Sequence, residues 1–148
     1  MDTKHVIDEL NDLVEKNHDA VDGFQNAAEK VQDHDLKNYL MEHVHQRNQF
    51  NSELRQEITS LGGTPKETKE GSASLHQTWM DIKTALSSNK EEAVLEECIR
   101  GDKNALDEYR DVLEETEVPA NVKTTVRKQM EQIESSLREL ERLEERYD

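Results

Sequence analysis

The chain has 148 residues and a formal net charge of -15, with 32% hydrophobic and 36% charged residues. This charge argues against nucleic acids and anionic membranes as partners, because most faces of the protein would repel a phosphate surface. No apolar run approaches the roughly 20 residues of a membrane span, no signal peptide opens the sequence, and Cys98 is the only cysteine, so we expect a cytoplasmic protein.

The first part of the sequence predicts a helical hairpin. Over residues 2–32, apolar side chains recur at three- and four-residue steps, as on one face of a long helix. The segment Asp33-His34-Asp35 supplies a turn and an N-cap for a second helix over 35–61, which Gly62-Gly63 ends. Because the turn is short, we expect the two helices to be antiparallel.

The remaining sequence predicts three more helices. A shorter helix over 72–88 carries a narrow apolar stripe that includes Leu75, Trp79 and Leu86. A long helix over 90–115 follows, with a broad apolar stripe. The last helix covers 119–147, with Pro119 at its first helical position.

These elements predict a single all-α domain over residues 1–148. Four long helices form two antiparallel hairpins, and a long crossover containing the fifth, shorter helix joins them. A crossover of that length can return along the whole bundle, which makes the helices over 35–61 and 90–115 parallel. This is the ferritin-like arrangement of a four-helix bundle.

One short motif resembles a metal-binding pattern. Glu42 and His45 form a Glu-x-x-His sequence, which di-iron carboxylate bundles use to hold metal. At about 100° per residue, however, both side chains point away from the apolar face of their helix. We therefore expect both of them to face solvent.

The same helical geometry predicts a polar layer inside the bundle. Its members are Asn17, His43, Arg47, Asp102 and Gln129. A dinuclear metal site needs about four carboxylates and usually two histidines, whereas this layer has one carboxylate and a competing cation. We expect an Arg47–Asp102 ion pair, with the other three residues completing its hydrogen bonds.

We therefore expect no catalytic residues, no metal and no cofactor. The alternative is an iron or manganese site that uses Glu42, His45, Glu97 and Asp102, with His43 or Gln129 as further candidates. Cys98 lies on the apolar stripe and is interpreted as a small core residue. Trp79 and Tyr109 are interpreted as packing residues.

Several segments together resemble a family of small bacterial ferritin-like proteins with a domain of unknown function. They are LNDLVEKNHD, GFQNAAEKVQD, ELRQEITSLGG, LHQTWMDIKTAL and VLEECIRGDKNALDEYRDVLEE. The resemblance covers nearly the whole chain and implies a ferritin-like fold and a bacterial source. It also implies an acidic residue where this chain has Val21, a glutamate at Asp102 and a histidine near Leu137. The departures at Val21 and Leu137 weaken a ferritin-type metal site.

The sequence therefore favours a non-enzymatic helical protein that acts by protein–protein interaction or self-association. The alternative is a ferritin-like iron or manganese binder, or a di-iron oxidase with a degraded site. A third possibility is a groove for a small molecule or partner helix lined by Leu75, Trp79 and Leu86. The broad stripe over 90–115 either forms a homodimer face or covers the crossover helix.

Overall fold

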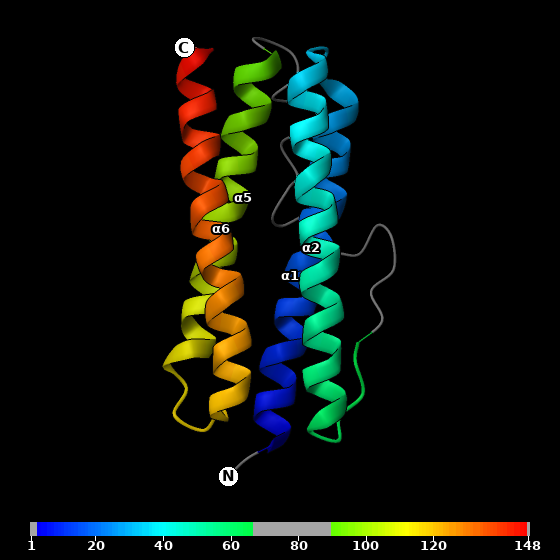
Figure 1. The fold of residues 1–148 in the computed structure, drawn as a ribbon, viewed down its shortest axis with the longest axis vertical. Coiled ribbons are helices and arrows are strands. Elements are labelled where there is room, and N and C mark those ends of the chain that lie inside the picture. The colour runs from blue at the N-terminus through cyan, green and yellow to red at the C-terminus, as the bar shows by residue number, and fades with distance from the viewer. Residues whose placement is uncertain (1–2, 67–89, 148) are drawn as a thin grey trace.

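The computed structural model describes residues 3–66 and 90–147. Four helices account for most of them: α1 (Thr3–Lys30), α2 (His34–Ser60), α5 (Lys90–Glu114) and α6 (Ala120–Arg146) (Figure 1). These bounds differ by at most two residues from those expected from the sequence. The helix expected over 72–88 and the groove formed by Leu75, Trp79 and Leu86 lie outside the described residues.

The turn between α1 and α2 follows the local sequence signals. Asp33 has an extended backbone, and its side chain accepts a hydrogen bond from the Leu36 N–H at 3.0 Å. An N-cap of this kind satisfies one of the backbone donors that the first turn of a helix leaves unpaired. The predicted N-cap is therefore present at Asp33.

The end of α2 also follows its sequence signal. Gly62 has a φ of 86°, the left-handed conformation that glycine adopts without steric cost. The Gly62 N–H donates to the Thr59 carbonyl at 3.0 Å and the Gly63 N–H to the Ile58 carbonyl at 2.9 Å. This paired pattern is a Schellman motif, which satisfies the last carbonyls of the helix.

The position expected for Pro119 is wrong by one residue. Pro119 is the N-cap of α6, with φ -60° and ψ 152°, and the helix begins at Ala120. Its carbonyl accepts the first helical hydrogen bond, from the Lys123 N–H at 2.9 Å. The fixed φ of proline suits both a helix and an extended residue, so φ does not determine which of the two positions Pro119 occupies.

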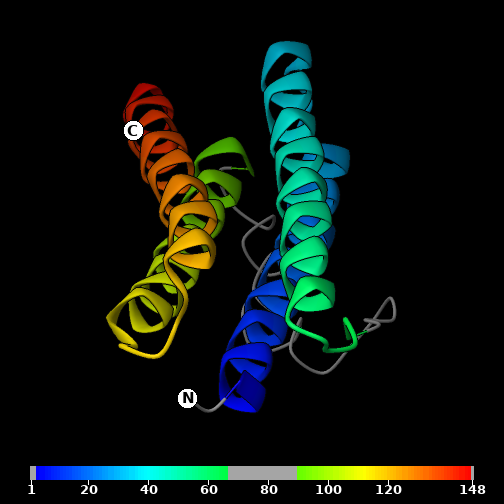
Figure 2. The same ribbon diagram turned by 60° about the horizontal axis from the view of Figure 1, so that its bottom comes forward.

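The two hairpins lie side by side, with α1 packed on α2 and α5, and α6 packed on α5 and α2 (Figures 1 and 2). In both views α2 and α5 run in the same direction, because α2 ends beside the start of α1 and α5 begins at the opposite end of the bundle. The connection between α2 and α5 thus joins opposite ends. This is the one-crossover topology expected from the sequence.

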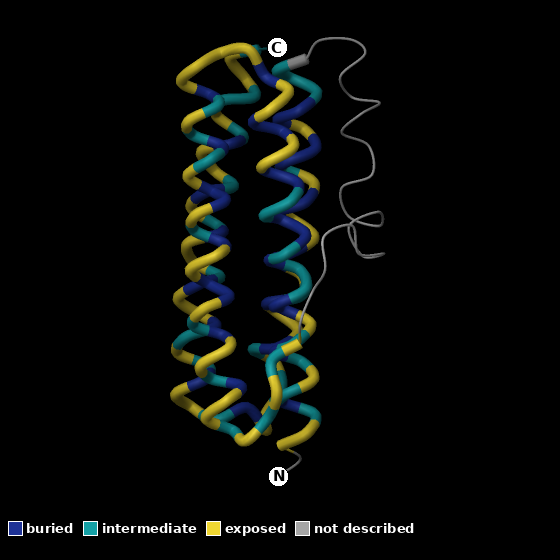
Figure 3. The backbone as a smooth tube through the Cα atoms, turned by 90° about the vertical axis from the view of Figure 1, so that its right-hand side faces the viewer, coloured by how far each residue is buried: buried dark blue, intermediate teal, exposed yellow. Residues whose placement is uncertain are grey.

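The core consists of two apolar clusters, one toward each end of the bundle, and buried residues line the facing sides of the helices (Figure 3). The first cluster includes Val14, Phe50, Leu106 and Ile133. The second includes Ala20, Val44, Cys98 and Leu140. Between the two clusters, the interior of the bundle holds buried polar residues such as Arg47 and Asp102.

None of the helices in residues 3–66 and 90–147 combines the length and apolarity that crossing a membrane requires.

Candidate functional site

The centre of the bundle holds an ion pair between two hairpins. Arg47 of α2 donates a hydrogen bond from Nη2 to Oδ1 of Asp102 on α5 at 2.9 Å, and both side chains are 0% exposed. Arg47 follows Leu40 and Val44 on the buried side of α2, and Asp102 follows Cys98 one turn later on α5. The apolar stripes of the two helices thus carry these charged residues into the interior.

The surroundings of Arg47 are mainly aromatic. Its guanidinium carbon lies 5.4 Å from the ring centre of Phe24 and 5.9 Å from that of Phe50. The Nε atom donates to Oε1 of Gln46 at 3.1 Å. Among the described residues, Nη1 of Arg47 and Oδ2 of Asp102 have no hydrogen-bond partner. The contact between Arg47 and Asp102 is therefore the main electrostatic compensation for burying both charges.

Burial and ion pairing act in opposite directions on Asp102. Removal from water raises the pKa of this carboxyl group, because a low-dielectric interior disfavours its charged form, and Arg47 lowers the pKa in part. Arg47 therefore favours the charged form of Asp102, which burial disfavours.

His43 is part of the interior but not of an acid–base pair. Its ring stacks on Phe24 with 4.6 Å between centroids and meets Tyr39 edge-on, also at 4.6 Å. Burial, with a smaller contribution from Arg47, lowers the pKa of His43 to about 3. Neither ring nitrogen has a hydrogen-bond partner among the described residues. At neutral pH His43 is an uncharged ring within an aromatic stack.

Asn17 and Gln129 belong to a separate hydrogen-bond chain. Nδ2 of Asn17 donates to the Tyr109 hydroxyl at 2.8 Å, and that hydroxyl donates to Oε1 of Gln129 at 2.7 Å. Nε2 of Gln129 then donates to the Phe50 carbonyl at 3.1 Å and to Oε1 of Glu53 at 2.9 Å. Both acceptors of Gln129 Nε2 are on α2, so the hydrogen-bond chain links α1, α5, α6 and α2.

This chain corrects the sequence expectation that Asn17, His43 and Gln129 complete the hydrogen bonds of the ion pair. Within residues 3–66 and 90–147, none of the three bonds to Arg47 or Asp102. Tyr109 was expected to be a packing residue only. Its hydroxyl instead forms hydrogen bonds with the side-chain amides of both Asn17 and Gln129. A tyrosine on an apolar stripe gives no sequence signal for such a role.

The residues of the alternative metal set do not converge. Glu42 and His45 are both exposed, Glu97 is buried at 6% exposure, and only Asp102 lies in the central ion pair. Glu97 accepts a hydrogen bond from Nε of Arg100 at 3.2 Å. Cys98 is fully buried in the apolar core, and burial raises the pKa of its thiol well above the usual value. The thiol is therefore not activated for nucleophilic chemistry.

Three buried polar residues were missed by the sequence analysis: Asp19, Asn51 and Ser136. Asn51 donates to the Val14 carbonyl at 3.2 Å, and Ser136 receives a long hydrogen bond from Gln46 at 3.4 Å. Ser136, rather than Gln129, lies between the two apolar clusters on α6. The residues three or four positions from Asp19 include Glu15, Lys16 and Asp22, which are all charged. The sequence therefore gave no sign that Asp19 is buried.

The interior donors do not fit the dinuclear metal centre of ferritin-like proteins. Hard divalent ions need several anionic oxygens to offset their dehydration. Among the described residues the buried carboxylates are Asp19, Glu97 and Asp102, fewer than the four that such a centre needs, and Oδ1 of Asp102 already accepts the hydrogen bond from Arg47. A metal ion at this level would lie beside a fixed guanidinium cation, which would repel it.

Comparison with solved structures supports the fold. One match is to a chain described as "A Dodecameric Thioferritin in the Bacterial Domain, Characterization of the Bacterioferritin-Related Protein from Bacteroides fragilis". The TM-score is 0.68 and the sequence identity 18%, and the alignment covers 99% of this chain and 86% of the other. At this identity the likeness establishes the ferritin-like fold alone.

No curated protein is detectably similar to this chain in sequence. A family model does match it, over residues 5–115, and that family is described as a domain of unknown function, DUF2383. The match takes in α1, α2 and α5, which supply Asn17, Arg47 and Asp102 of the interior. The chain therefore belongs to the DUF2383 family, with a ferritin-like four-helix bundle as its fold.

Proposed function

We propose that this protein is a non-enzymatic, cytoplasmic helical bundle that acts through self-association or protein–protein interaction. The observation that carries the proposal is the Arg47–Asp102 ion pair, in which both side chains are 0% exposed. It places a guanidinium cation in the central layer and engages the carboxylate of Asp102. Such a layer can fix the register of the two hairpins, a role for which buried ionic groups are known.

The similar bacterial protein described as dodecameric supports the self-association part of the proposal. The formal charge of -15 opposes assembly through long-range repulsion, and salt screens that repulsion. We therefore expect assemblies larger than the monomer, favoured by high ionic strength. Light scattering coupled to size-exclusion chromatography, over a range of protein and salt concentrations, tests this. A monomer under every condition would refute self-association.

The non-enzymatic part of the proposal is tested by an iron oxidation assay. Fe²⁺ is added aerobically to the protein, and the rate of oxidation is compared with that in buffer and with the Asp102→Asn variant. We expect equal rates in all three, because Asp102 is already paired with Arg47. Oxidation that is accelerated by the protein and lost in Asp102→Asn would instead support the alternative, a degraded iron or manganese centre.

A further inference from the structure

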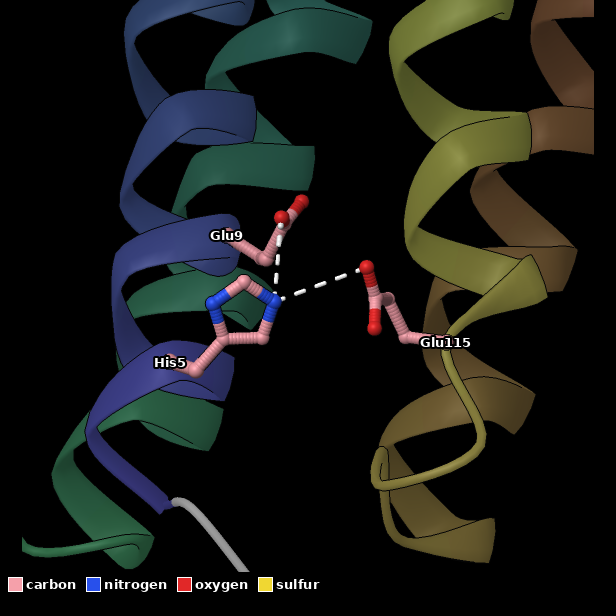
Figure 4. A group of neighbouring side chains, drawn as sticks. All are labelled: His5, Glu9 and Glu115. Atoms are coloured by element: carbon pink, nitrogen blue, oxygen red, sulfur yellow. Dashed lines mark ion pairs between the residues drawn. The ribbon is translucent and has the colours of Figure 1, made fainter.

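A second group of titratable side chains lies at the end of the bundle where α1 begins and α5 ends. His5 and Glu9 are one turn apart on α1, and Glu115 directly follows α5 (Figure 4). All three side chains point into the space between the two helices. The Nε2 atom of His5 lies 3.5 Å from Oε1 of Glu9 and 3.5 Å from Oε1 of Glu115.

These distances suit a shared metal ion better than direct hydrogen bonds. An N–H···O hydrogen bond spans about 2.7–3.2 Å, so 3.5 Å is long for one. Zinc binds histidine nitrogen and carboxylate oxygen at about 2.0–2.2 Å, and a tetrahedral ion with such bonds holds its ligand atoms about 3.4 Å apart. One donor atom from each of the three residues lies within 4.8 Å of the other two. The two distances from Nε2 of His5 are thus close to tetrahedral spacing.

The surroundings favour a cation. A hollow of about 500 Å³ beside the group is lined by Glu9, Asp12, Glu108, Asp111, Glu114 and Glu115. A bound cation would offset the repulsion among these carboxylates.

The side chains are also reachable from solvent. Those of His5, Glu9 and Glu115 are 43%, 23% and 38% exposed. An ion can therefore enter without opening the bundle and keep water in its remaining coordination position, as at open zinc sites.

We propose that His5, Glu9 and Glu115 form a binding site for one divalent first-row transition-metal ion, with zinc as its representative. The imidazole ligand selects zinc and similar ions over magnesium and calcium, which prefer all-oxygen sites. Because α1 and α5 belong to different hairpins, the bound ion fastens the two hairpins together at this end. The site is independent of the proposed function, which rests on the interior.

Isothermal titration calorimetry tests the site with untagged protein freed of metal by chelator, because a polyhistidine tag would itself bind zinc. We expect one Zn²⁺ per chain and no comparable binding of Mg²⁺. The variants His5→Gln, Glu9→Gln and Glu115→Gln should each weaken Zn²⁺ binding at least about tenfold. Circular dichroism establishes that each variant is folded, so that lost affinity reports on the ligand.

Two matched controls come from the same chain. His45→Gln removes an exposed histidine that belongs to the alternative metal set. Glu144→Gln alters the all-carboxylate group Glu92, Glu96 and Glu144, which lacks a nitrogen ligand. Both should keep the affinity of the unmodified protein. Absence of Zn²⁺ binding, or an affinity unchanged by His5→Gln and Glu9→Gln, would overturn the proposal.

Histidine ¹⁵N NMR locates the ion directly. Of the six histidines, His5 should show the large shift of a ring nitrogen that binds zinc, while His45 and His18 should not. A shift at His45 or His18 in place of His5 would also overturn the proposal. Neither result depends on the iron oxidation assay, so the site and the proposed function can fail separately.

Discussion

Replacing Arg47 by methionine isolates the energetic role of the central ion pair. Methionine keeps an unbranched apolar chain that can pack beside Phe24 and Phe50, but it ends short of the guanidinium position and removes the charge that faces Asp102. Asp102 would then be a fully buried carboxylate without its cation. Breaking a buried pair in this way costs about 3–5 kcal/mol. For a chain of this size, 1 kcal/mol corresponds to about 2–4 °C, so Tm should fall by about 10 °C.

The size of this loss should depend on pH. Without Arg47, burial raises the pKa of Asp102 further above its unfolded value, so the folded protein takes up a proton at a higher pH than the unfolded chain. Above the unfolded pKa, stability then falls as pH rises through the folded pKa. The deficit of Arg47→Met should thus be largest at neutral pH and become smaller as the pH is lowered toward the unfolded pKa of Asp102.

Urea unfolding, followed by circular dichroism, measures the free energies of a double-mutant cycle. The control is Arg47→Met combined with Asp102→Leu, which removes both charges and should restore most of the stability, because no buried charge is left unpaired. If Arg47→Met costs less than about 1 kcal/mol, or if the double variant is as unstable as the sum of the single changes, the ion pair is not the electrostatic compensation described above.

Three further predictions concern the polar interior and the helix ends. Tyr109→Phe removes the hydroxyl shared by Asn17 and Gln129, and the free energy of unfolding should fall by about 1–3 kcal/mol; Tyr39→Phe, whose hydroxyl bonds to Glu139 in an exposed contact, should cost less. Gly62→Ala forces alanine into a φ of 86° and should lower the free energy of unfolding by about 1 kcal/mol; an unchanged urea midpoint would contradict the strain argument. His43 has a pKa lowered to about 3, so the unfolded state binds its proton first and stability falls as pH drops below about 6.5. In His43→Phe this fall in stability below about pH 6.5 should disappear. Identical profiles of unfolding free energy against pH for the two proteins would refute the prediction.

The sequence determined the helices and most of the polar residues that point inward. Regular apolar spacing predicted α1, α2, α5 and α6 to within one or two residues, and local signals at Asp33 and Gly62 are visible because caps depend on a few neighbouring residues. The exposure of Glu42 and His45 followed from helical periodicity alone. Periodicity fixes which side of a helix faces the core, and it placed Asn17, Arg47 and Asp102 on that side.

Only the tertiary structure decided which of these residues meet. Helical phase does not fix how far one helix is shifted along another, so the hydroxyl of Tyr109 could not be placed between Asn17 and Gln129 from the sequence. The same shift brings Glu115 to His5 across the two hairpins. Contacts between helices depend on their relative height and spacing, which arise from the packing of the whole bundle.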